Sequence, residues 1–223
     1  IAEVGAGNRK DVRNAVEAAQ AAENWTAMTG HARAQVLFYL AENLSARASE
    51  FAARIILQTG VTPAAARQEV DLSIERIYYY AAQADKYDGA VHHTITRNVT
   101  LAMPEALGVM GIICPDEFPL LGLLSNLLPP LSMGNRVIVI PSSTAPLSAT
   151  DLYQVLETSD VPAGVVNIIT GNKEELAAVL ANHDDVDGVW YTGSQAGCKA
   201  IEHAAAENMK RTWVNYGKFR DWT

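Results

Sequence analysis

Five short apolar runs, each separated from the next by a segment with helical spacing, constrain the fold of this 223-residue chain more than any other feature. The runs are GVMGIIC (108–114), RVIVI (136–140), VVNII (165–169), GVWYT (188–192) and RTWV (211–214). Helices fit between them at 119–133, 146–158, 173–182 and 195–208. Continuous apolar runs are typical of strands that are buried on both faces of a parallel sheet. The pattern therefore predicts an α/β fold with a Rossmann-like, doubly wound parallel sheet over residues 108–223, and a ligand crevice at the carboxyl ends of its strands.

The first part of the chain, residues 1–90, is expected to be helical and to pack on this sheet. Apolar residues recur at helical spacing in NRKDVRNAVEAAQAAENW, in HARAQVLFYLAENLSARASEFAARIILQTG and in PAAARQEVDLSIERIYYYAAQADKY. Gly60 is predicted to end the second of these helices, and Pro63 to lie in the first turn of the third. Over residues 91–107, Thr, Val and Ile alternate with polar residues, which predicts a small β-arm of the kind used in oligomers.

Composition excludes several classes of partner. The formal net charge is -8, whereas nucleic-acid binding requires clustered Lys and Arg. The longest apolar run, around VMGIIC, is too short to cross a membrane. Cys114 and Cys198 lack metal-ligand spacing, and the adjacent His92 and His93 would point to opposite faces of a strand, so no metal site is predicted. This cysteine usage fits a reducing compartment, and a cytoplasmic location is expected.

Four polar stretches at the predicted strand ends are the candidates for a site. They are CPDEFPLL (114–121), VIPSSTAPLSA (139–149), ITGNKEE (169–175) and YTGSQAG (191–197). Gly193 and Ser194 precede a helix, where backbone N–H groups can hold a phosphate, although Gly-Ser also caps helices for structural reasons alone. The adjacent carboxylates Asp116 and Glu117 allow two interpretations: an acid pair that faces a substrate, or one that is favoured by the dipole of the following helix.

Taken in order and spacing, these stretches resemble the cofactor domain of the aldehyde dehydrogenase superfamily. The matching pieces are GVMGIICPDEFPLL, PPLSMGNRVIVIPSSTAPLSA, VPAGVVNIITG and HDDVDGVWYTGS. The helical part is similar to the same family through DVRNAVEAAQAA, RAQVLFYLAENL and YYYAAQADKYDG. The resemblance implies an enzyme in which a cysteine thiolate attacks an aldehyde and an amide with a backbone N–H stabilises the oxyanion. It also implies that hydride passes to NAD(P) and that a glutamate activates water.

The catalytic positions implied by the resemblance are altered in this chain. Glu117, with Asp116 beside it, stands where the family has an asparagine that donates to the oxyanion, and an ionised carboxylate cannot donate. Asn215 stands where the family has its glutamate base, and an asparagine cannot take a proton from water. The nucleophile of the family lies in a catalytic domain that is expected to be absent here. Neither Cys114 nor Cys198 has a partner base that could replace it.

The cofactor positions are altered as well. Ile140 stands at the family's ribose-binding lysine and Ser143 at a nearby glutamate, while Lys173 and Ala177 replace two small residues. Cys198 replaces the last glycine of the Gly-Ser helix motif. Pro115, Gly193 and Ser194 are retained, and they are predicted to be vestigial cofactor-binding positions. No cofactor is expected, unless the chain is part of an active enzyme, in which case NAD(P) is expected.

This pattern resembles the degenerate second domain at the C-terminus of aldehyde dehydrogenase family 16. It predicts a structural domain without catalytic activity that assembles with a catalytic aldehyde dehydrogenase module, or with its own copy, through the strand arm. One alternative is a fragment of an active NAD(P)-dependent enzyme that oxidises an aldehyde to a carboxylic acid. Another is a binding domain in which Asp116 and Glu117 contact a cationic group. The aromatic end, WVNYGKFRDW, is either a docking tail or the place where a longer chain was cut.

Overall fold

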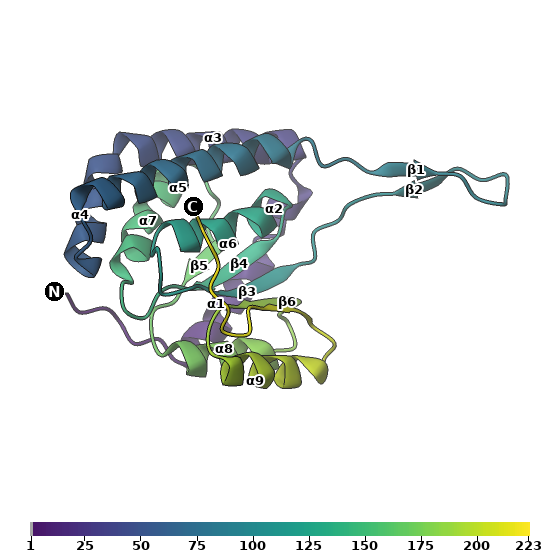
Figure 1. Ribbon diagram of the computed structural model, residues 1–223. Helices are drawn as coiled ribbons and strands as arrows, with labels where there is room; N and C mark the ends of the chain where they lie inside the picture. The colour runs from purple at the N-terminus through teal and green to yellow at the C-terminus, as the bar shows by residue number, and fades with distance from the viewer. Residues whose placement is uncertain (1) are drawn as a thin grey trace.

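A parallel sheet forms the centre of the molecule in the computed structural model, which describes residues 2–223 (Figure 1). Its strands lie in the order β5 (Val166–Ile168), β4 (Arg136–Ile140), β3 (Val109–Ile113), β6 (Gly188–Tyr191) and β7 (Arg211–Val214). Every neighbouring pair is parallel. From β3 the chain winds outward first to β4 and β5 and then to β6 and β7, so the predicted doubly wound α/β fold is confirmed.

Helices cover both faces of the sheet because successive side chains of each strand point to opposite faces. On β4, Val137 and Val139 enter the apolar cluster that includes residues of α3 to α7, whereas Ile138 and Ile140 enter the cluster with α1, α8 and α9. The helices that follow the first four sheet strands are α6 (Leu121–Ser132), α7 (Leu147–Thr158), α8 (Lys173–Asn182) and α9 (Gln195–Ala206). All four lie within the predicted segments.

The first part of the chain forms helices on both sides of the sheet. They are α1 (Arg9–Ala21), α2 (Glu23–Ala27), α3 (Gly30–Ala46), α4 (Ala48–Thr59) and α5 (Pro63–Ala84). Gly60 ends α4 in a left-handed conformation and Pro63 begins α5, as predicted. The expectation of one continuous helix up to Gly60 is wrong, because the chain bends at Arg47 between α3 and α4. The bend allows Leu44 and Phe51 to enter the same core.

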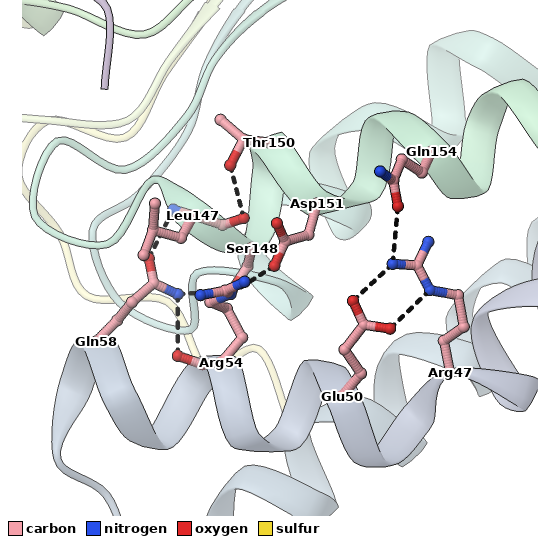
Figure 2. Close-up of polar contacts among 9 residues, drawn as sticks. All are labelled: Arg47, Glu50, Arg54, Gln58, Leu147, Ser148, Thr150, Asp151 and Gln154. Carbon is pink, nitrogen blue, oxygen red and sulfur yellow. Dashed lines mark hydrogen bonds and ion pairs between the residues drawn. The ribbon is translucent and has the colours of Figure 1, made fainter. Parts of the chain in front are cut away.

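A polar seam joins α4 to α7 and fixes the start of α7 (Figure 2). Gln58 Oε1 accepts a hydrogen bond from the backbone nitrogen of Leu147 at 2.6 Å, and Gln58 Nε2 donates to Ser148 Oγ at 2.9 Å. Beside it, Arg54 Nε lies 2.5 Å from Asp151 Oδ2. Since α7 has no side-chain cap of its own, Gln58 supplies the missing acceptor from another helix.

A hairpin arm projects away from the body of the molecule (Figure 1). Its strands, β1 (Ala90–His92) and β2 (Thr100–Ala102), are antiparallel, and Val91 lies directly opposite Leu101. All six strand residues are exposed. Over residues 2–223, no helix is both long enough and apolar enough to cross a membrane.

Candidate functional site

A crevice of about 400 Å³ opens at the carboxyl ends of the sheet strands. The loops after β3, β5, β6 and β7 contribute to its wall. Most positions singled out from the sequence line this one crevice: Pro115, Asp116, Glu117, Lys173, Gly193, Ser194 and Asn215. The altered cofactor positions Ile140, Ser143, Ala177 and Cys198 are not in its wall. The structure therefore brings the lining residues together where a doubly wound sheet binds its ligands.

Asp116 holds three donors in the crevice. Its Oδ1 accepts hydrogen bonds from Ser142 Oγ at 3.0 Å and from the Ser143 backbone nitrogen at 2.9 Å. Its Oδ2 lies 3.1 Å from Lys173 Nζ. Partial burial opposes ionisation of Asp116, but Lys173 and the two serines outweigh it and hold the pKa of this carboxyl below its ordinary value.

The interpretation of Asp116 and Glu117 as an acid pair at a helix N-terminus is wrong. No acidic residue lies in the first turn of α6, and its N-cap makes no side-chain hydrogen bond. Glu69 of α5 caps the helix instead: its Oε1 accepts from the backbone nitrogens of Leu120 and Leu121 at 2.9 and 3.2 Å. Burial raises the pKa of Glu69, and the two N–H groups offset part of that rise. Glu117 is exposed and forms no ion pair with any residue between 2 and 223.

Lys173 is the residue whose role was not predicted from the sequence. It is the first residue of α8, and only 9% of its side chain is exposed. Lys173 and Asp116 both differ from the residues that the family has at these positions, but the sequence did not predict that they form an ion pair. Their pairing depends on the loops after β3 and β5 meeting at one edge of the sheet, which no local pattern reveals.

The Gly193–Ser194 step and Asn215 satisfy one another's hydrogen bonds. The Gly193 backbone nitrogen donates to Asn215 Oδ1 at 3.0 Å, and Asn215 Nδ2 donates to the Lys218 carbonyl at 3.1 Å. Ser194 Oγ accepts from the Gly197 backbone nitrogen at 3.0 Å and so caps α9. Asn215 therefore acts as a clamp between two loops, and its amide cannot take a proton from water as a general base does.

The space between the starts of α8 and α9 is filled by side chains. The Tyr191 hydroxyl donates to Glu174 Oε1 at 2.5 Å. Gly197 is required beside this pair, because a Cβ there would lie 2.1 Å from the Tyr191 oxygen and 2.9 Å from Glu174 Oε2. Burial is the main cause that raises the pKa of Tyr191, and the bond to Glu174 adds to it.

Both cysteines are buried. Burial raises the pKa of Cys114 to about 12, with Lys173 acting against the rise and Asp116 adding to it. Cys198 is fully buried, and its sulfur accepts a hydrogen bond from the Tyr216 backbone nitrogen at 3.2 Å. Neither thiol is presented to the crevice as a nucleophile.

The residues present do not fit the NAD(P) contacts that the resemblance implies. Ile140, at the expected ribose contact, is buried and has no polar side-chain atom. The Gly193 N–H is already bonded to Asn215, and the charge of Lys173 is matched by Asp116. Over residues 2–223, no group of three His, Cys, Asp or Glu side chains is arranged to hold a metal ion.

The C-terminal segment contributes to the wall of the crevice through Gly217, Lys218, Phe219, Arg220 and Trp222. The Arg220 guanidinium lies 5.7 Å from the ring centre of Trp213 and 4.7 Å from that of Trp222. Arg76 of α5 donates to the Trp222 carbonyl at 3.0 Å, and Trp222 is only 3% exposed. The aromatic residues of this segment were the signal for a docking tail, and here the segment docks on its own chain.

Comparisons with known proteins agree with this fold. Residues 1–218 match the model of the aldehyde dehydrogenase family. The NADP/NAD-dependent aldehyde dehydrogenase PuuC of Escherichia coli is 33% identical over 97% of this chain, and the match covers 45% of that protein. Human retinaldehyde dehydrogenase 3 is also 33% identical over 97% of the chain and is covered to 44%.

Solved structures give the same result. A putative aldehyde dehydrogenase from Burkholderia cenocepacia superposes with a TM-score of 0.93 at 32% identity, over 96% of this chain and 44% of that one. The NAD+ complex of a betaine aldehyde dehydrogenase variant from Staphylococcus aureus superposes with a TM-score of 0.92 at 27% identity, with the same coverage. The chain thus spans less than half the length of the relatives it matches. It belongs to the aldehyde dehydrogenase family.

Proposed function

We propose that this chain is a non-catalytic aldehyde dehydrogenase domain whose role is assembly, either with its own copy or with a catalytic aldehyde dehydrogenase module. The observation that carries the proposal is the apolar face of the hairpin arm. Val91 and Leu101 are directly opposite, and the period of two places Val99 and Met103 on the same face of the arm. These four side chains are 58% to 79% exposed, and Ile95 at the tip is fully exposed.

Such an arm gains stability only by contact with another surface. An isolated two-stranded hairpin is at best marginally stable in water. Burying one large aliphatic side chain contributes roughly 1.5–3 kcal/mol, so four of them facing one partner offer a substantial driving force. A projecting, apolar hairpin is therefore better explained as an interface than as a solvated loop.

Three features of the crevice support the absence of catalysis. Glu117 places a carboxylate where an oxyanion needs a donor, and loss of one such donor lowers a rate roughly 100- to 1000-fold. Asn215 is held by two loops and has no basic group. Both thiols are buried. We propose in addition that NAD(P) does not bind and that the protein works in the reducing cytoplasm, which its two free cysteines support.

The assembly role is tested by sedimentation equilibrium of the chain at tens of micromolar, alone and mixed with a full-length catalytic aldehyde dehydrogenase. A defined oligomer or hetero-complex is expected. The double variant Val91→Asp/Leu101→Asp should dissociate it, because both carboxylates lie on the apolar face. His92→Asp/Thr100→Asp is the matched control, since it adds the same two carboxylates to the opposite face of the arm. A monomer under both conditions, or equal loss with the His92→Asp/Thr100→Asp control, contradicts the proposal.

The second candidate is a portion of an active NAD(P)-dependent aldehyde dehydrogenase. It is favoured by the chain covering less than half of its relatives, one of which is solved with NAD+. Calorimetric titration with NAD+ and NADP+ separates the two candidates. Micromolar binding supports the enzyme portion, and no heat at millimolar cofactor supports the assembly domain. NAD-dependent aldehyde oxidation that is lost on replacing a cysteine would overturn the non-catalytic role outright.

A further inference from the structure

We propose that Asp116 and Lys173 form an internal latch that ties the carboxyl ends of three sheet strands together and keeps Cys114 covered. The latch consists of the Asp116 carboxylate and its three donors, from Ser142, Ser143 and Lys173. It concerns the crevice and not the hairpin arm, so it stands or fails independently of the assembly role.

The latch joins segments that are distant in the sequence. Asp116 lies in the loop after β3, the two serines follow β4, and Lys173 follows β5. The two carboxylate oxygens contact different segments. Oδ1 accepts from Ser142 Oγ and the Ser143 nitrogen in the loop after β4, at 3.0 and 2.9 Å, and Oδ2 lies 3.1 Å from Lys173 Nζ at the start of α8. One side chain thus bridges the ends of three adjacent strands, at the place where a bound ligand would bridge them in a doubly wound sheet.

The position of Lys173 indicates that it is there for this contact. It is the first residue of α8, and the N-terminus of a helix disfavours a positive charge. Only 9% of its side chain is exposed, and lysines are almost never buried so deeply without a partner. In residues 2–223, Asp116 is the only carboxylate within ion-pair distance of Lys173. The Asp116 carboxylate offsets both the unfavourable position of the charge at the helix N-terminus and the cost of burying the ammonium.

The unequal burial of the two partners predicts an unequal response to mutation. Asp116→Asn leaves the Lys173 ammonium buried without a countercharge, which is the costly way to break an ion pair. Lys173→Met leaves Asp116 with its two serine donors and with 47% of its side chain exposed to water. The first variant should therefore be much less stable than the second.

A thermal double-mutant cycle tests this asymmetry. Asp116→Asn is expected to lower Tm by roughly 4–8 °C, Lys173→Met by about 2 °C, and the double variant by no more than Lys173→Met alone. Glu117→Gln is the matched control, because it also removes one carboxylate charge, at the neighbouring residue. Glu117 has no ion-pair partner within residues 2–223, so this variant should leave Tm unchanged. Additive effects, or equal effects of Asp116→Asn and Glu117→Gln, overturn the latch. If Asp116→Asn does not fold, the double variant must still fold with the Tm of Lys173→Met.

Alkylation of the two thiols provides a local readout. Cys114 lies two residues before Asp116 and belongs to the apolar cluster on the α6 face, whereas Cys198 belongs to the cluster on the other face. Opening the latch should raise the iodoacetamide labelling rate of Cys114 about tenfold relative to that of Cys198. Peptide mass spectrometry measures both rates in one sample, so a general loss of stability, which raises both, is distinguished from local opening.

Lys173→Met separates opening of the latch from a change in thiol acidity. Without the ammonium, the Cys114 thiolate is less favoured, so an electrostatic effect alone would slow its labelling. The latch predicts the opposite, a severalfold faster labelling of Cys114, because the loop after β5 is released. A slower or unchanged rate in Lys173→Met overturns the proposal.

Discussion

Glu69 and Leu120, which lie on different elements, form the contact that starts α6: Glu69 Oε1 is 2.9 Å from the Leu120 backbone nitrogen. The carboxylate is almost completely buried and satisfies two N–H groups that the helix itself cannot satisfy. This one side chain ties α5 to the beginning of the helix that follows the crevice loop.

Glu69→Ala should destabilise the protein, because two buried N–H groups lose their acceptor. The expected loss is about 2–3 kcal/mol of the free energy of unfolding, measured by urea denaturation. Glu75→Ala on the same helix is the control, because the exposed Glu75 side chain makes no hydrogen bond or ion pair within residues 2–223. Equal losses in the two variants would contradict the capping role.

Glu69→Gln should change how stability depends on pH. The pKa of Glu69 is raised in the folded protein, so the folded state keeps its proton to a higher pH than the unfolded state does. Stability from this group is therefore lost as pH rises from the unfolded value, about 4.3, through the folded pKa. Glu69→Gln keeps an acceptor oxygen without the charge, and its urea midpoint should gain on that of the wild type as pH rises through this window.

For Asp116, the contribution to stability depends on pH in the opposite direction, and it changes at lower pH than that of Glu69. Its pKa is lowered in the folded state, so its contribution is present above the unfolded value, about 3.9, and is lost as pH falls through the folded pKa. The stability difference between wild type and Asp116→Asn should be complete near neutral pH and should shrink as pH falls below about 3.9. A difference that persists undiminished in acid would show that the charge is not the cause.

The C-terminal segment that lines the crevice, residues 217–222, should be released by removing the buried Trp222 side chain. Trp222→Ala removes a buried side chain and one of the two rings against which Arg220 stacks. Cleavage by trypsin after Lys218 should then accelerate about tenfold or more, while cleavage after Lys199 on α9 serves as the internal reference. Arg220→Lys should have a smaller effect of the same kind, because an ammonium stacks less well on indole than a guanidinium does.

Gln58→Ala should cost about 1–3 kcal/mol of unfolding free energy, because the first turn of α7 loses its acceptor. Gln154→Ala provides the control from the other side of the same seam (Figure 2). Within residues 2–223, the Gln154 side chain bonds only to the partly exposed Arg47 guanidinium, so its loss should change the urea midpoint little.

The sheet and its helices could be predicted because their signals are local. The continuous apolar run 136–140 placed β4 at its observed limits, and the segment 173–182 matches α8. The run 211–214 matches the limits of β7, but the expected burial on both faces is wrong there, because β7 is an edge strand with three of its four residues exposed. The break between α3 and α4 could not be predicted, because Arg47 is a good helix former and no Gly or Pro marks the bend. The apolar residues on both sides of the bend decide it through the shared core.

The position of the candidate site could be predicted from the sequence, but its hydrogen bonds and ion pairs could not. Pro115, Gly193 and Asn215 were located by motif, and all three line the crevice. The partners that decide their chemistry come from elsewhere in the chain. Glu69 is 51 residues from Leu120, and Lys173 follows a different strand from Asp116. Such pairs follow from the tertiary arrangement, which brings the strand ends together, and not from any spacing in the sequence.

The placement of α1 has a consequence for how the protein is made. The chain begins on one face of the sheet and crosses to the other before α3, so Val12 and Val16 pack against Ile138 and Leu180, while Leu37 packs on the opposite side. Within residues 2–223, the first sheet strand that packs on α1 is β3, so during synthesis α1 meets its sheet only after α2 to α5 and the hairpin arm have left the ribosome. Nascent chains that end before β3 lack the strands that bury the apolar stripe of α1, and they should depend on chaperones to keep this stripe from aggregating.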